Sequence, residues 1–193
     1  MKFAAIEKKL AGTLSPKRFL HSQGVSQTAA QLAVKFGADR DKAALAGILH
    51  DCARAFSNTE LLRLAEEIAL PLKKIDKLCP VLLHAPVGAY VAQEAFQISD
   101  EEILQAISFH TLGGKGMGVL DKIIYLADFI EPGRACPNAA SLRDFAFSEG
   151  ASLDEAMLRA YDSSIYYTLG KRELVHTATI KGRNELLLKL AES

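Results

Sequence analysis

Apolar residues recur three and four positions apart along most of the chain, which is the pattern of amphipathic helices. After Ser57, for example, Leu61, Leu64 and Ile68 fall on one helical stripe. No segment shows a convincing alternation with the period of two that marks a strand. We therefore predict an all-α protein, built as one helical domain of roughly eight to ten helices, given the usual helix length.

Capping residues predict where these helices begin and end. Ser15 before Pro16 is typical of an N-cap followed by the first helical residue, and Gly37 is typical of a left-handed stop. Asp39 is expected to cap a helix that extends to about Ala55. Three Ser-x-x-Glu boxes and one threonine predict four further helix starts: Ser57–Glu60, Ser99–Glu102, Ser152–Glu155 and Thr177.

Length and charge narrow the classes of function. The chain has 193 residues, so residues 1–193 are expected to form a single domain. Its 23 basic and 23 acidic side chains cancel, so we expect no DNA, RNA or membrane partner that binds through overall charge. The first twenty residues lack the apolar run of a signal peptide, and the three cysteines match neither a disulfide framework nor a CxxC metal site. These features predict a cytoplasmic protein.

Two loops carry cationic side chains. The connection from Leu112 to Gly118 is rich in glycine but lacks the spacing of a phosphate-binding P-loop. It is either a flexible connection between helices or a mobile rim that places Lys115 near an anion. The second loop, residues 131–137, follows the end of a helix and is expected to expose Arg134.

Histidine and aspartate carry the candidate chemistry. His50 and Asp51 are adjacent at the end of an apolar helix, so a metal above that helix could take both, or Asp51 could bridge two metals. Asp128 lies on a very apolar helix, where an unpaired carboxylate would cost several kcal/mol, so it requires an arginine or a metal. His84 and His110 also follow apolar residues. A single histidine of this kind is usually a hydrogen-bonded core residue, but together these residues suit a shared polar centre in a bundle.

Five short motifs resemble, in order, the H…HD…H…H…D series of the HD-domain phosphohydrolases. The resemblance is closer to the YqeK-type symmetrical bis(5′-nucleosyl)-tetraphosphatases, and it extends from about residue 15 to residue 187. The motifs that carry it are residues 18–22, 50–54, 83–88, 109–113 and 127–134, with a closing motif at 174–176 and 183–184. Two positions depart from that family, since Arg54 stands where it usually has lysine and Thr177 where it often has proline.

The resemblance implies an all-α HD-type bundle with two metal ions, which are irons in the family. By analogy, one ion would be held by His21, His50 and Asp128, the other by His84 and His110, with Asp51 bridging. Catalysis would rest on Asp51, His110 and Asp128, through a metal-bridging hydroxide that attacks an inner phosphorus. The residues expected to bind substrate are Arg18, Lys115, Arg134 and His176. The implied reaction is symmetrical cleavage of diadenosine tetraphosphate into two ADP.

Several alternatives stay open at this point. The ligand types, imidazole and carboxylate without thiolate, suit manganese or zinc as well as iron. A different HD phosphohydrolase would act on a nucleoside monophosphate or a guanosine polyphosphate. A non-catalytic nucleotide- or metal-binding module is a third reading. The apolar helix faces leave a homodimer possible, and sequence alone does not separate core from interface.

Overall fold

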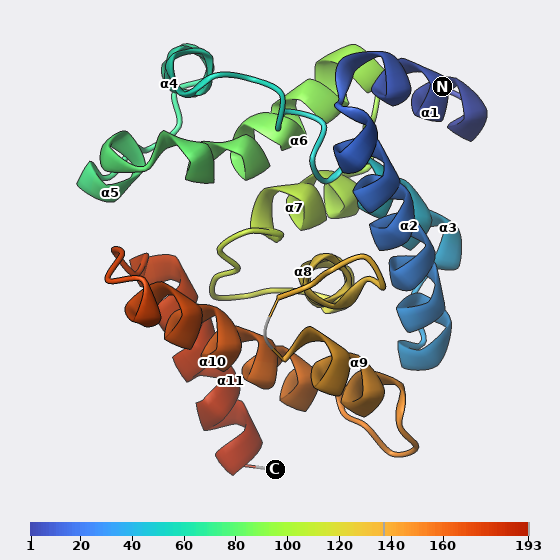
Figure 1. The fold of residues 1–193 in the computed structure, drawn as a ribbon, viewed down its shortest axis with the longest axis vertical. Coiled ribbons are helices and arrows are strands. Elements are labelled where there is room, and N and C mark those ends of the chain that lie inside the picture. Colours follow the sequence, from blue (N-terminus) through green and yellow to red (C-terminus); the bar gives the residue numbers. More distant parts are fainter. Residues whose placement is uncertain (137, 193) are drawn as a thin grey trace.

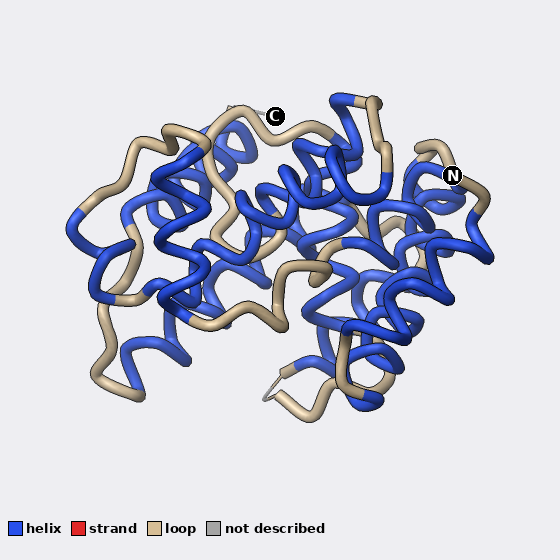
Figure 2. Tube along the Cα trace, turned by 90° about the horizontal axis from the view of Figure 1, so that it is seen from above, coloured by secondary structure: helices blue, strands red, loops and turns tan. Residues whose placement is uncertain are grey.

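The computed structural model describes residues 1–136 and 138–192. Within these residues the chain forms eleven α-helices and one 3-10 helix, η1, and no strand (Figures 1 and 2), which confirms the predicted all-α class. The elements are α1 Phe3–Thr13, α2 Pro16–Phe36, α3 Arg40–Leu49, α4 Asn58–Glu67, α5 Lys74–Leu78, η1 Pro80–Leu83, α6 His84–Phe96, α7 Glu101–Phe109, α8 Val119–Ile130, α9 Ala139–Phe147, α10 Leu153–Gly170 and α11 Thr177–Ala191. Among the described residues the helices outnumber the predicted eight to ten, because pieces as short as the five-residue α5 contain too few apolar repeats to be recognised. None of these helices combines the length and the apolar character needed to span a bilayer.

Helix α8 is the centre of the bundle. Figure 1 shows it end-on in the middle, with α2 and α3 on one side, α6 and α7 above, and α9 to α11 below. It packs directly against α2, α7 and α10. Six of its apolar side chains are at most 2% exposed: Leu120, Ile123, Ile124, Leu126, Ala127 and Ile130. Most of α8 is therefore enclosed by neighbouring helices, and even its polar residues Asp121 and Lys122 are at most 9% exposed.

Several predicted caps are confirmed. Ser57 accepts a hydrogen bond from the Glu60 amide at 3.3 Å, and the Glu60 carboxylate accepts one from the Ser57 amide at 2.7 Å, which completes the predicted box. Helix α2 begins at Pro16 and ends at Phe36; Ser15 is its N-cap in position but makes no side-chain capping bond, and Gly37 is its left-handed C-cap with a φ of 72°. Helix α11 begins at Thr177, as predicted.

Two boundaries were wrong. The helix capped by Asp39 ends at Leu49 rather than near Ala55, because turns follow in which the Cys52 amide bonds to the Leu49 carbonyl at 2.9 Å. Helix α7 is capped by Asp100 rather than by Ser99. The Asp100 carboxylate accepts from two amides of the first turn, where its negative charge also complements the helix dipole.

The third Ser-x-x-Glu box is confirmed only in position. Ser152 is the N-cap of α10, but its side chain makes no capping hydrogen bond.

Candidate metal centre and substrate cleft

Five separate elements bring the predicted ligands together. The ligand atoms fall into three groups, each within 4.8 Å: His21–His50–Asp51, His50–His110–Asp128 and Asp51–His84–His110. Asp51 belongs to two of these groups. Its Oδ1 lies 3.3 Å from His84 Nε2 and 3.8 Å from His110 Nε2, whereas its Oδ2 lies 3.8 Å from His50 Nε2. The two oxygens of one carboxylate therefore face different histidines.

Helix ends orient three of the four histidines. The Nδ1 of His50 bonds to the Gly47 carbonyl and that of His110 to the Ile107 carbonyl, each at 2.7 Å, and His84 makes the same bond to Val81. Carbonyls at the end of a helix lack partners within the helix, so they are free to accept these bonds. Because a carbonyl can only accept, Nδ1 carries the proton and Nε2 presents its lone pair to the centre.

A carboxylate orients the fourth histidine. His21 Nδ1 lies 3.0 Å from Glu131 Oε1, and the Gly133 amide donates to Glu131 Oε2 at 2.6 Å. Glu131 reaches His21 because Gly24, one turn further along α2, has no side chain. A Cβ at position 24 would lie 2.5 Å from Glu131 Oε2. Sequence reasoning missed this role of Glu131, and the only signal for it was a glycine three residues after His21.

The donor atoms fit cations. The Nε2 atoms of His84 and His110 are 3.1 Å apart, and two lone pairs at this distance repel unless a proton or a metal ion lies between them. The Nε2 of His50 is buried and has no hydrogen-bond partner. Nitrogen and oxygen donors without a thiolate suit iron, manganese or zinc. The cluster therefore fits metal ions of the kind predicted.

The pKa shifts of His50, His110 and Asp128 favour the forms that bind metal ions, whereas the pKa of His21 is raised because Asp128 and Glu131 outweigh the effect of its burial. Burial, together with the neighbouring His50 and His84, lowers the pKa of His110 to about 3. Burial likewise lowers the pKa of His50. Burial opposes the charge of Asp128, but His21 and Arg134 hold its pKa below the usual value. Neutral imidazoles and charged carboxylates are the forms that bind metal ions.

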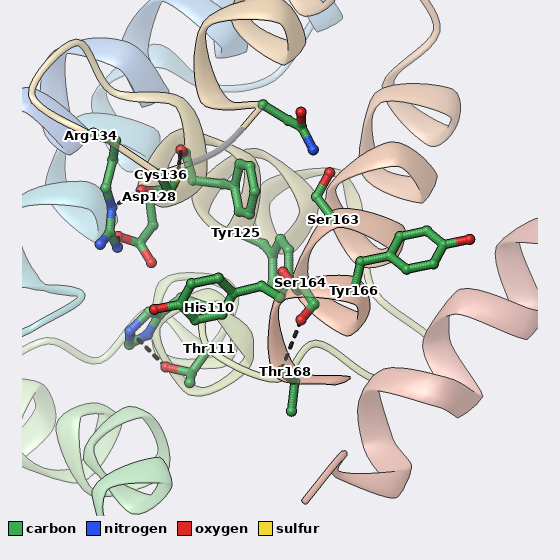
Figure 3. Close-up of a pocket in the computed structure, with 13 residues that line it drawn as sticks. His110, Thr111, Tyr125, Asp128, Arg134, Cys136, Ser163, Ser164, Tyr166 and Thr168 are labelled. Carbon is green, nitrogen blue, oxygen red and sulfur yellow. Dashed lines mark hydrogen bonds and ion pairs between the residues drawn. The ribbon is translucent and has the colours of Figure 1, made fainter. Parts of the chain in front are cut away.

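Two predicted arginines lie at the edge of the centre. Arg18 Nη1 bonds to Asp51 Oδ2 at 2.9 Å. Arg134 bonds to the Asp128 carboxylate through Nη2 and to the Asp128 carbonyl through Nε, the latter at 2.7 Å (Figure 3). The sequence required an arginine or a metal beside Asp128, and the arginine is present.

Two adjoining cavities, the first and second chambers of the cleft, open beside the ligands. The first, with a volume of about 600 Å³, is lined by His110, Asp128 and Arg134 among others (Figure 3). The second, of about 480 Å³, reaches His176. The two chambers share four lining residues: Thr111, Tyr125, Ser164 and Thr168. We call these four residues the ridge.

Comparisons with known proteins agree with this geometry. Residues 18–133 match the HD domain family, a span that contains all six ligand candidates. The chain is 37% identical over 174 residues to the symmetrical bis(5′-nucleosyl)-tetraphosphatase of Bacillus subtilis (strain 168), covering 90% of this chain and 91% of that protein. The chain belongs to this HD-domain family. It is also 40% identical over 176 residues to the protein of the same name from Halalkalibacterium halodurans, covering 91% and 92% of the two chains.

A solved structure extends the family likeness to the whole fold. A crystal structure described as a predicted HD superfamily hydrolase involved in NAD metabolism, from Clostridium acetobutylicum, superposes with a TM-score of 0.92 at 35% identity. The match covers 98% of each chain. The all-α HD architecture inferred from the sequence motifs is therefore confirmed.

Not every predicted substrate residue of this HD-domain protein faces the cleft. His176 caps α11, because its Nδ1 accepts from the Ala178 amide at 3.0 Å, and it lines the second chamber. Lys115 is exposed in the connection between α7 and α8 and lines a separate hollow beside α11. That connection is held in place, since the Gly114 amide donates to the Tyr161 hydroxyl at 3.0 Å. Lys115 is thus not brought to the centre.

One arginine was noted in the sequence only as a departure from the family and was not predicted to bind substrate. Arg54 is partly buried in the turn after the His50–Asp51 pair, and burial followed by the charges of Arg18 and Arg134 lowers its pKa. Across residues 1–136 and 138–192, its guanidinium has no hydrogen bond or ion pair, unlike the other two arginines. It is a cation close to the centre that is available to an anionic ligand.

Proposed function

We propose that this HD-domain protein hydrolyses dinucleoside tetraphosphates, diadenosine tetraphosphate in particular, symmetrically into two nucleoside diphosphates. The observation that carries the proposal is the cluster of four inward-facing Nε2 atoms with Asp51 shared between two of its groups. Relatives that are 37% and 40% identical over nine-tenths of the chain bear the name of this activity, which supports the substrate.

Two ions would divide the ligands around Asp51. We assign His21, His50 and Asp128 to one ion and His84 and His110 to the other, with Asp51 shared. The proximity of Asp51 to His84 and His110 through one oxygen, and to His50 through the other, supports this division. Such a pair supplies a nucleophile at neutral pH and neutralises charge on the phosphates. We propose iron as the metal, and the nitrogen and oxygen donor set supports it.

The protein's own cations would position the polyphosphate. Arg18 and Arg134 each hold a ligand carboxylate through one charge-assisted bond, and a guanidinium has further N–H groups to offer to phosphate oxygens. All the N–H groups of the Arg54 guanidinium are available to phosphate oxygens, since none has a partner among the described residues. We therefore assign phosphate binding to these three arginines and substrate contact to His176 in the second chamber. The position of Lys115 lends no support to a role in the cleft.

The remaining assignments follow from the same reaction. The substrate is a small molecule, so no DNA, RNA or membrane partner is required. We expect the protein in the cytoplasm, where its three unpaired cysteines stay reduced. A homodimer stays a prediction that sedimentation would test.

Asp51→Asn tests the mechanism. This change should abolish hydrolysis and lower the metal content while the helical circular dichroism is retained. Hydrolysis that persists in the variant after its metal has been removed would refute the metal mechanism.

A panel of substrates tests the reaction itself. Wild-type protein loaded with metal should convert diadenosine tetraphosphate into ADP alone. Release of AMP and ATP, or turnover only of a nucleoside monophosphate or a guanosine polyphosphate, would favour another HD phosphohydrolase. Metal binding without any hydrolysis would favour a sensor.

A further inference from the structure

The two chambers of the cleft differ in charge. The first is lined by Arg134 and borders the metal ligands His110 and Asp128. The second contains no lysine or arginine in its lining, and Glu173 gives it a negative charge. A phosphate group is therefore favoured in the first chamber and disfavoured in the second.

The second chamber is instead suited to an uncharged, partly apolar group. Its walls come from the segment around η1 and from α10 and the start of α11, and most of its side chains are apolar. Leu78 and Leu174 line it and remain 60% and 55% exposed, so they present apolar surface that a flat ring could cover. His176 in the same lining is 7% exposed, and its Nε2 faces the buried Asp76 carboxylate, 3.4 Å from Oδ1. An apolar pocket with a few polar groups is the usual composition of a small-molecule site.

The ridge joins the second chamber to the metal centre. Thr111 belongs to both chambers, and its Oγ1 lies 3.0 Å from the Nε2 atoms of both His84 and His110. A polyphosphate that passes over Thr111 from one chamber to the other therefore passes beside His84 and His110.

We propose that the second chamber binds the far nucleoside of the dinucleoside tetraphosphate, while the first holds the other nucleoside and the phosphates lie across the ridge. This assignment rests on the proposed function. It explains how one centre cuts in the middle of a substrate with two identical ends, because each end has its own place. After cleavage, each chamber holds the nucleoside of one ADP, whose phosphates remain at the ridge.

Binding of the product ADP tests the proposal without turnover. Equilibrium dialysis of metal-loaded wild-type protein should give two ADP per chain. Leu174→Trp, which fills the second chamber with a larger side chain, should give one, and so should Leu78→Trp, which enters from another element. The control is Leu188→Trp on α11, which is 65% exposed and outside both chambers, and it should keep two. Circular dichroism establishes that each variant is folded.

A pair of substrates gives a second readout. Adenosine tetraphosphate has the same four phosphates as diadenosine tetraphosphate but only one nucleoside. Leu174→Trp should raise the KM for diadenosine tetraphosphate about tenfold, equivalent to about 1.4 kcal/mol, and should change that for adenosine tetraphosphate less than twofold. Only a group at the far end of the substrate explains such a difference.

The outcomes separate the two proposals. One ADP per wild-type chain, or two that neither variant removes, overturns the second nucleoside site. Equal changes in KM for both substrates overturn it as well. Two ADP sites without hydrolysis of either substrate would instead refute the proposed reaction and leave the binding sites standing.

Discussion

Glu131→Gln should weaken binding of one metal ion. In the native protein the carboxylate accepts two bonds, from His21 Nδ1 at 3.0 Å and from the Gly133 amide at 2.6 Å. A glutamine carries no charge and has only one accepting atom. If its oxygen faces His21, its NH₂ group opposes the Gly133 amide, and if it is flipped, the NH₂ group opposes His21. One bond is lost in either case.

The magnitude follows from the bonds. A hydrogen bond to a charged group contributes roughly 1.5–3 kcal/mol, against about 1 kcal/mol for a neutral one. The difference of about 0.5–2 kcal/mol corresponds to roughly two- to thirtyfold in metal affinity, which overlaps the effect known for partners that orient metal-binding histidines. We expect the loss at the ion held by His21, while the ion held by His84 and His110 keeps its affinity.

Competition with a chelator, followed by metal analysis, measures both affinities. Asp121→Asn is the matched control. Asp121 is also a buried carboxylate of the α8 region, 1% exposed against 4% for Glu131, and accepts bonds from Gln105 and the Gly118 amide. It should lower the melting temperature without changing metal affinity. An unchanged affinity in Glu131→Gln, or an equal decrease in both variants, would refute the role of Glu131.

Three further predictions follow. Gly24→Ala should reproduce the metal defect without altering the carboxylate, because its Cβ would lie 2.5 Å from Glu131 Oε2; normal metal affinity would contradict the packing. Arg54→Ala should raise the KM for diadenosine tetraphosphate by about tenfold, the effect expected when one hydrogen bond between charged groups is lost. The metal content should not change, and Arg54→Lys should keep part of the affinity. The metal-free protein should lose stability as the pH falls from about 6.5 to about 3. Over this range His110 binds a proton in the unfolded chain, whereas in the folded protein its pKa of about 3 keeps it neutral. Melting temperatures at pH 7 and pH 4.5 check this, and a constant value would contradict the burial of a neutral His110.

The six candidate ligands could be named from the sequence because each lies in a short motif that resembles the HD-domain family, and the structure brings them together. The His50–Asp51 pair and the spacing of the other histidines on apolar helices are visible without tertiary structure. The helix that carries this pair was nevertheless predicted too long, since its end at Leu49 depends on turns that compete with continued helix.

Contacts between distant segments could not be predicted. Glu131 and His21 are 110 positions apart, and their bond depends on how closely α2 approaches the end of α8. Lys115 illustrates the opposite error. A lysine among glycines is typical of an anion-binding loop, but the packing of the following helices directs this loop toward α11. The second chamber is formed by residues from distant parts of the chain, between Asn58 and Thr179, and has no local sequence signal.

The connection between α7 and α8 bears on which length of polyphosphate the protein accepts. It is tied to α10 by the Gly114–Tyr161 bond, and Gly182 of α11 packs so closely that a Cβ there would lie 2.6 Å from the Gly114 carbonyl oxygen. The helices that line the second chamber are thereby fixed to the segment that follows His110. We therefore expect the span between the two proposed nucleoside positions to be set before any nucleotide binds. A dinucleotide with three or five phosphates would reach the catalytic ions out of register, so chain length would be selected by a rigid frame.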